Sequence, residues 1–177
     1  MGPPLSRSQQ TALVVLRTLI GWHFVYEGFV KMLWPAWSRA GVPLARFSSA
    51  GYLRSSTGPF AEFFRGLADV SWLPWLDQIV AWSLLLVGLG LVLGLFTQLA
   101  GAGALTLLAL FYVSWLPTRG VSEAGTEGTY LVVNKNLVEA AAVGVVLVFR
   151  TGRIAGLDLL RGRTRAQVVP PVAEATR

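Results

Sequence analysis

Four long apolar stretches constrain the fold of this chain more than any other feature. They cover residues 11–33, 78–96, 99–117 and 131–149. A helix of about 20 residues crosses the hydrocarbon core of a bilayer, and each stretch is close to that length. Only 14% of the residues are charged, whereas soluble domains carry roughly 25%. We therefore expect an all-α integral membrane protein that folds as a four-helix bundle.

The lengths of the connections predict how these spans are arranged. Thr97 and Gln98 alone join the second span to the third, which predicts a tight antiparallel hairpin. The connections 34–77 and 118–130 are much longer. Within the first of them, four apolar residues fall at helical spacing and predict an amphipathic helix on the membrane or over the bundle. These residues are Phe60, Phe63, Phe64 and Leu67.

The basic residues predict the orientation in the membrane. Four spans place both termini on one side, and five arginines follow the last apolar stretch, at positions 150, 153, 161, 163 and 165. Because cytoplasmic loops carry the excess of Lys and Arg, we expect both termini to be cytoplasmic and both long connections to be extracytoplasmic. Four arginines between residues 39 and 65 oppose this assignment. We expect one domain over residues 1–160 and a basic cytoplasmic tail over 161–177, in the cytoplasmic membrane of a bacterium or archaeon.

Composition excludes several kinds of chemistry. The chain has no cysteine, which excludes disulfides, iron–sulfur ligation by its own thiols and a Cys nucleophile. Its single histidine argues against a self-contained metal site, so we expect neither a metal nor a flavin. The net charge of +6 is not concentrated on a soluble face, and with this hydropathy we expect no nucleic-acid partner.

Ionisable residues interrupt the first apolar stretch at regular intervals. His23, Glu27 and Lys31 recur every four residues, and Arg17 precedes them. With about 100° per residue, all four fall within an arc of about 120° on one helix face. Membrane spans carry such residues at a cost, and they usually face a bundle interior or a cavity.

The fourth apolar stretch repeats this pattern in the opposite direction. Lys135 and Glu139 lie four residues apart, with Asn134 and Asn136 beside Lys135. In the expected topology both sets lie in the outer halves of their helices. We therefore expect them to converge in a polar cluster near the outer leaflet, together with Asp77, Gln78, Tyr112, Ser114 and Trp115. The cluster is either a functional site or a buried network of i,i+4 pairs that specifies packing.

Three segments resemble the DoxX/DoxD family of small four-helix membrane proteins. They are "RTLIGWHFVYEGFVKML" (17–33), "EGTYLVVNKNLVEAAA" (127–142) and "TGRIAGLDLL" (151–160). In the first, Arg17, Gly21, Gly28 and Lys31 match the spacing of the first-helix motif of the family. The resemblance covers residues 15 to 160 and implies the fold more firmly than a reaction.

The resemblance implies an oxidoreductase subunit that couples oxidation of thiosulfate, or of another small reductant, to reduction of a membrane quinone. His23, Glu27 and Glu139 are then the candidate catalytic residues, as proton relays. Candidate substrate and quinone contacts are Arg17, Trp22, Tyr26, Lys31, Tyr112, Asn134, Lys135 and Asn136. Quinone serves as co-substrate in this interpretation. The chain has no electron-storing group of its own, so a soluble or membrane partner subunit is expected.

Two other functions remain compatible with the sequence. One is a non-catalytic membrane scaffold for a redox or respiratory complex, which the absence of an electron-storing group favours. The other is a small-solute or ion permease, because charge pairs inside a membrane also mark transport paths. Four spans are few for a permease, although a homo-oligomer could supply the pathway.

Overall fold

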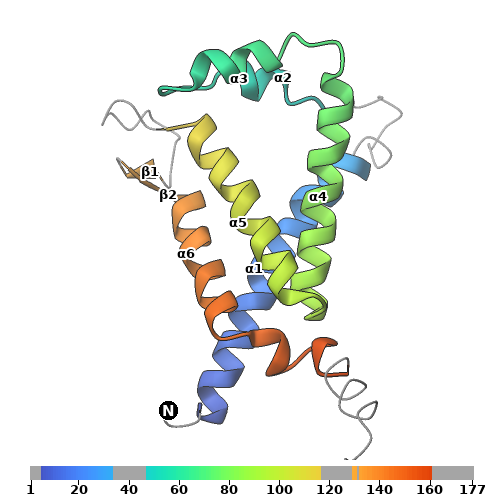
Figure 1. The fold of residues 1–177 in the computed structure, drawn as a ribbon, viewed down its shortest axis with the longest axis vertical. Coiled ribbons are helices and arrows are strands. Elements are labelled where there is room, and N and C mark those ends of the chain that lie inside the picture. Colours follow the sequence, from blue (N-terminus) through green and yellow to red (C-terminus); the bar gives the residue numbers. More distant parts are fainter. Residues whose placement is uncertain (1–4, 34–46, 117–128, 131, 161–177) are drawn as a thin grey trace, which may run out of the picture.

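Four long helices lie side by side and alternate in direction along the chain (Figure 1). The computed structural model describes residues 5–33, 47–116, 129–130 and 132–160. The four helices are α1 (Arg7–Leu33), α4 (Leu73–Leu93), α5 (Thr97–Ser114) and α6 (Lys135–Val148). Helix α1 packs against α4 and α6, and α5 packs against the same two helices. The contact of α1 with α6 is the less extensive of the two that α1 makes.

Three of these helices are long and apolar enough to cross a membrane. They are α1, α4 and α5 among the described residues, so the prediction of a mostly helical protein with apolar spans is confirmed in that form. Helix α6 has 14 residues and rises about 21 Å, less than the thickness of a hydrocarbon core of about 30 Å. Four membrane spans therefore stay a prediction.

The core lies between the four long helices. Its most buried members include Leu91, Ala104, Val143 and Val146, each no more than 1% exposed. Helices α1 and α4 pack with their backbones in close contact, because a Cβ atom on Gly28 would lie 2.6 Å from the backbone nitrogen of Leu85. On the opposite side of the interface, a Cβ atom on Gly88 would lie 2.4 Å from the nitrogen of Val25. These glycines therefore let the two backbones touch.

The turn between α4 and α5 lies earlier than the sequence predicts. Helix α4 ends at Leu93, and Gly94 follows in the left-handed region with φ of 63°. The nitrogen of Leu95 donates to the carbonyl of Gly90 at 2.9 Å, which closes the helix as left-handed glycine caps commonly do. Thr97 is already the first residue of α5. The predicted Thr97–Gln98 connection is therefore wrong, because the glycine cap ends α4 before the apolar run ends.

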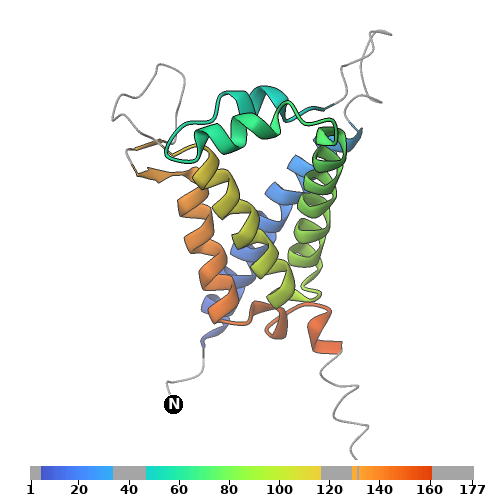
Figure 2. The ribbon, with the colours of Figure 1, turned by 45° about the horizontal axis from the view of Figure 1, so that its top comes forward.

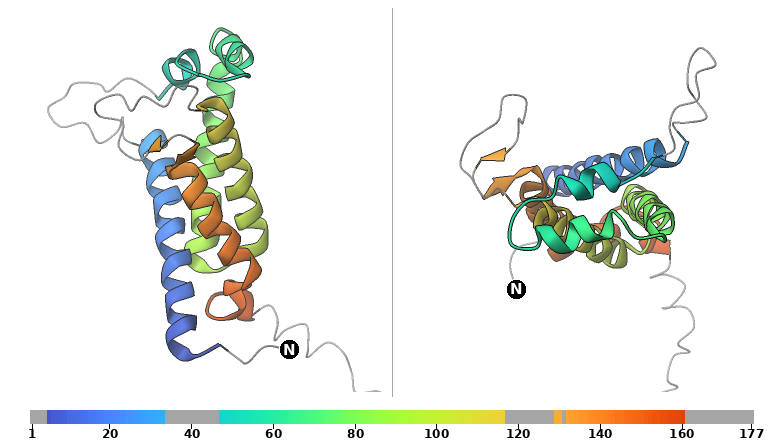
Figure 3. Two further views of the ribbon diagram at one scale, coloured as in Figure 1. Left: turned by 90° about the vertical axis from the view of Figure 1, so that its left-hand side faces the viewer. Right: turned by 90° about the horizontal axis from the view of Figure 1, so that it is seen from above.

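A cap of two short helices covers one end of the long helices (Figures 2 and 3). They are α2 (Ala50–Arg54) and α3 (Ala61–Leu67), where the sequence predicts one amphipathic helix. Phe64 of α3 is buried, whereas Phe60 and Phe63 are exposed.

Hydrogen bonds fasten this cap to α4 and α5. The nitrogen of Ser49 donates to Asp77 Oδ1 at 3.0 Å, and the hydroxyls of Tyr52 and Ser114 lie 2.6 Å apart. Thr57 Oγ1 donates to the carbonyl of Leu116 at 2.8 Å. Asp77 and Ser114 thus belong to the cap, although the sequence suggests that they join the polar cluster.

A minimal hairpin delays the start of α6. Strand β1 (Thr129–Tyr130) pairs antiparallel with β2 (Val133–Asn134). Asn134 then caps α6, because its Oδ1 accepts from the nitrogen of Leu137 at 3.0 Å. The helix therefore begins at residue 135 and not at 131. The hairpin and an isolated bridge between Thr57 and Trp115 are the β features of the described residues.

The segment after α6 closes the end opposite the cap, where α1 begins (Figure 1). It starts with the short helix η3 (Thr151–Arg153). Arg17 of α1 is 3% exposed, and its Nη1 donates to the carbonyls of Thr151 at 3.0 Å and Ala155 at 2.7 Å. Asp158 accepts from the nitrogens of Phe96 at 2.8 Å and Thr97 at 2.9 Å. We call this set of contacts the inner clamp. The predicted tail 161–177 lies outside the described residues.

Candidate functional site

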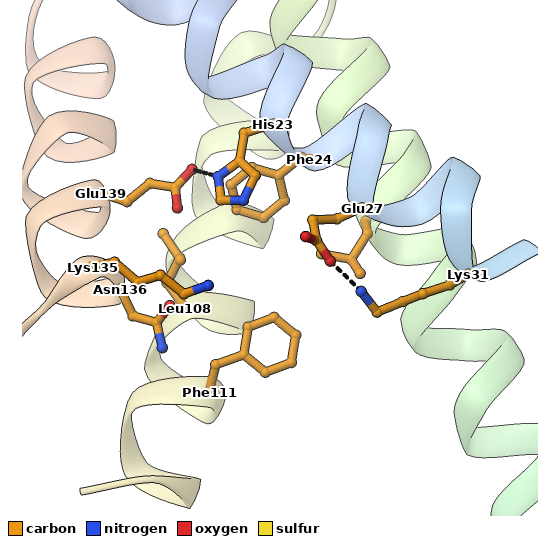
Figure 4. A pocket seen from close by; sticks show the side chains of 10 residues that line it. His23, Phe24, Glu27, Lys31, Leu108, Phe111, Lys135, Asn136 and Glu139 are labelled. Atoms are coloured by element: carbon orange, nitrogen blue, oxygen red, sulfur yellow. Dashed lines mark hydrogen bonds and ion pairs between the residues drawn. The ribbon is translucent and has the colours of Figure 1, made fainter. Parts of the chain in front are cut away.

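A small pocket lies between α1, α4, α5 and α6, near the start of α6 (Figure 4). Its volume is about 90 Å³. We call it the charged pocket, because five of its lining residues are ionisable. It is lined by His23, Phe24, Glu27, Lys31, Leu84, Leu108, Phe111, Lys135, Asn136 and Glu139. The structure thus brings together six of the residues that the sequence predicts for the site.

A hydrogen bond between His23 and Glu139 connects α1 to α6 at the pocket. His23 Nδ1 lies 2.8 Å from Glu139 Oε1. A carboxylate can only accept, so Nδ1 carries the proton and Nε2 of a neutral ring is an acceptor. Figure 4 shows this second ring nitrogen turned toward the pocket. The histidine side chain is 45% exposed and that of Glu139 13%. The pair therefore forms an oriented carboxylate–imidazole dyad.

The second charge pair lies one turn further along α1. Lys31 Nζ donates to Glu27 Oε2 as an i,i+4 pair, which is favourable spacing on a helix surface. The Lys31 ammonium also lies 5.4 Å from the centre of the Phe47 ring, within the range of a cation–π contact. Glu27 is the more exposed partner, at 42% against 20% for Lys31.

Lys135 differs from the other charged groups of the pocket. Its ammonium forms no hydrogen bond or ion pair with any residue that the structure describes. Figure 4 shows its side chain extending into the pocket beside Asn136. Two lysines balance two glutamates here, so protonation of His23 leaves one positive charge in excess. The pocket can therefore accept an anion and a proton together.

Five predicted site residues lie outside the charged pocket. Arg17 belongs to the inner clamp, and Asn134 caps α6. Trp22 and Tyr26 are 61% and 52% exposed on the outside of α1. The hydroxyl of Tyr112 donates to the carbonyl of Val132 at 2.8 Å. The aromatic residues expected to contact a quinone, Trp22, Tyr26 and Tyr112, therefore do not line the charged pocket.

Apolar residues that the sequence did not suggest complete the pocket wall. They are Phe24, Leu84, Leu108 and Phe111. The sequence does contain a signal that places Phe24 in the pocket. On a helical wheel with Arg17 at zero, the ionisable residues of α1 fall between 240° and 360°, and Phe24 falls at about 340°. Leu84, Leu108 and Phe111 look like ordinary core residues in sequence.

Within the described ranges, no three His, Asp or Glu side chains lie close enough together to hold a metal ion. Comparisons with protein-family models, with curated proteins and with solved structures found no match to this chain.

Proposed function

We propose that this chain is a DoxX/DoxD-like membrane subunit of an oxidoreductase that oxidises a small sulfur oxyanion and passes the electrons to a quinone. The observation that carries the proposal is the His23–Glu139 dyad, whose bond spans 2.8 Å and whose second nitrogen faces a charged pocket. Reduction of a quinone to a quinol takes up two electrons and two protons. Imidazole is suited to move those protons, because its charge changes near neutral pH.

The size of the pocket supports an oxyanion as its occupant. A cavity of about 150 Å³ accommodates benzene, and the charged pocket holds about 90 Å³. It therefore admits a small oxyanion or a few water molecules, and a quinone ring would have to contact the dyad from the mouth. Lys135, which has no bonded acceptor among the described residues, supplies the attraction for the anion.

Reduction of the quinone requires a second substrate that supplies the electrons, and a group that transfers them between the two substrates. Oxidation of two thiosulfate ions to tetrathionate releases two electrons, which equals the need of one quinone. The chain has no cysteine, and its described residues contain no cluster of three His, Asp or Glu side chains that could hold a metal ion. A soluble or membrane partner would thus carry the electrons between the two substrates.

The proposal includes four membrane spans with both termini in the cytoplasm of a bacterium or archaeon. The arrangement of the helices supports it, because the start of α1 and the segment 151–160 lie at the same end (Figure 1). The charged pocket and the cap would then face the outside. The sulfur oxyanion would reach the pocket from that side.

Transport by a single chain is less well supported. The inner half of the molecule is filled by Leu91, Val143 and Val146, each no more than 1% exposed. A solute in the charged pocket would have to cross this core to reach the other end. A scaffold without catalysis stays compatible with the structure, since a partner subunit is part of the proposal.

The test is thiosulfate-dependent quinone reduction in membranes that contain the full chain together with candidate partner subunits. We expect Glu139→Gln and Lys135→Met to abolish most of the activity of the wild type. Glu62→Gln is the matched control, because Glu62 is exposed on α3 and lies away from the pocket. Wild-type membranes that reduce no quinone would refute the proposal. Equal activity in all variants would refute the assignment of the site.

A further inference from the structure

The charges that line the charged pocket cancel as long as the His23 ring is neutral. Two acidic and two basic side chains of α1 and α6 surround the ring, namely Glu27, Lys31, Lys135 and Glu139. The lining residues from α4 and α5 are apolar, namely Leu84, Leu108 and Phe111. An anion that enters alone would therefore leave an uncompensated negative charge beside apolar side chains, which is costly. Protonation of His23 supplies the missing positive charge.

The positions of Lys135 and His23 couple these two events. The two side chains lie close enough for their charges to interact. An unpaired Lys135 ammonium repels a second positive charge on the ring. Figure 4 shows the Lys135 side chain and the free ring nitrogen of His23 extending into the same pocket. An anion on the ammonium cancels the repulsion and can accept a hydrogen bond from protonated Nε2. Anion and proton thus favour each other's binding.

We propose that the charged pocket takes up one proton with each oxyanion, which then lies between the Lys135 ammonium and a protonated His23. Glu139 stabilises the charged ring from its other side, because its Oε1 accepts from Nδ1 at 2.8 Å. His23 is then an anion-binding residue as well as a carrier of protons. The inference rests on the proposed function and names how its substrate and its proton are linked at the same site.

The proton count of the coupling matches that of the proposed reaction. Two thiosulfate ions, two protons and one quinone give one tetrathionate ion and one quinol. The net charge is minus two on each side, and the two electrons released by the thiosulfate ions reduce the quinone. Two oxyanions that each bring one proton therefore deliver the two protons that formation of the quinol consumes.

The experiment measures binding of sulfate to the purified full chain in detergent by isothermal titration calorimetry. Sulfate is a redox-inert oxyanion that does not titrate between about pH 6 and pH 8, where imidazole changes its charge. Titrations in two buffers that differ in their heat of ionisation count the protons taken up. For the wild type we expect close to one proton per anion wherever the free ring is neutral. The dissociation constant should then rise by up to about tenfold per pH unit.

Three variants assign the proton and the anion to their residues. His23→Gln cannot take up a proton in this range, so its sulfate affinity should not depend on pH. Lys135→Met should lose most of the sulfate binding at every pH. Arg153→Met is the matched control, because it also removes one positive charge but lies exposed on η3, away from the pocket. It should bind sulfate with the affinity and the proton uptake of the wild type.

The wild type alone decides the outcome if a variant does not fold. Sulfate binding without proton uptake, or no sulfate binding at any pH, would overturn the proposal. Proton uptake that persists in His23→Gln would overturn the assignment to His23. No step measures quinone reduction. Membranes that reduce quinone with thiosulfate, combined with a sulfate affinity that does not depend on pH, would therefore refute the coupling and leave the proposed function standing.

Discussion

The inner clamp and the charged pocket both place ionisable residues among apolar helices, but they satisfy those residues in different ways. Arg17 and His23 lie less than two turns apart on α1. Arg17 is buried and donates to two backbone carbonyls. His23 is half exposed and bonds a side chain across a cavity. Hydrogen bonds to backbone carbonyls fix a charged side chain in one position. Side chains around a cavity can instead change their hydrogen-bond partner and their protonation state. We therefore expect the inner clamp to contribute to stability and the charged pocket to the proposed function.

Replacement of Arg17 should have the largest effect on stability. Arg17→Met removes two hydrogen bonds, one buried and one partly buried, so the carbonyls of Thr151 and Ala155 lose their charged donor. We expect a loss of about 3 kcal/mol in the free energy of unfolding, measured by denaturation of the purified protein in detergent micelles. Arg153→Met is the control, because Arg153 is exposed and should change stability by about 0.5 kcal/mol at most. If the two variants were equally stable, the stabilising role of the inner clamp would be refuted.

Replacement of Glu139 should affect activity and leave the fold intact. Glu139→Gln keeps an acceptor for His23 Nδ1 but removes the negative charge that stabilises the protonated ring. We expect quinone reduction to fall on the order of 100-fold, the lower range for loss of acid–base catalysis. The free energy of unfolding should change by less than about 1 kcal/mol, as for a single hydrogen bond. A loss of activity that only follows the loss of folded protein would assign the dyad to structure.

Two glycines allow a matched test of close packing. Gly28→Ala places a methyl group 2.6 Å from the backbone nitrogen of Leu85 and should cost about 2 kcal/mol. Gly144 has no atom within 4 Å of an added Cβ, so Gly144→Ala should be neutral or gain up to about 1 kcal/mol from helix propensity. Thermal unfolding of both variants in detergent measures the difference. Similar shifts would mean that α1 and α4 are not packed by backbone contact.

The smallest expected effect concerns the attachment of the cap. Burial raises the pKa of the Tyr52 hydroxyl, which also bonds Ser114. The folded state thus holds this proton more tightly than the unfolded state, so stability is unaffected below pH of about 10 and falls as the pH rises above it. Tyr52→Phe should lose about 1 kcal/mol near neutral pH and show a weaker fall at high pH. An identical pH profile for both proteins would contradict this role of Tyr52.

The sequence predicts those features whose signal is local. The apolar runs predict α1, α4 and α5 because length and hydropathy are properties of one segment. The i,i+4 spacing predicts the pocket residues on α1 and on α6, since neighbours on a helix face share a surface. Trp22 and Tyr26 are candidates for the site only because of their aromatic rings. They fall at about 140° and 180° on the helical wheel, on the face opposite the charged stripe.

Other features depend on contacts between distant segments. Arg17 lies on the same helix face as His23, but its partners are the carbonyls of residues 151 and 155. No local sequence pattern predicts these partners. The start of α6 is set by the pairing of β1 with β2, which is too short to leave an alternating pattern. The end of α4 depends on the left-handed Gly94 within a run that is apolar throughout.

In the proposed arrangement of four membrane spans, the length of α6 has a consequence for the surrounding lipid. A helix of 14 residues falls about 9 Å short of a hydrocarbon core of about 30 Å. A bilayer accommodates such a mismatch by thinning or by drawing headgroups inward beside the short element. This local deformation would bring the water boundary down to the level of Lys135 on the α6 side. Protons and solutes would then reach the dyad through a dimple in the membrane and not through a channel in the protein.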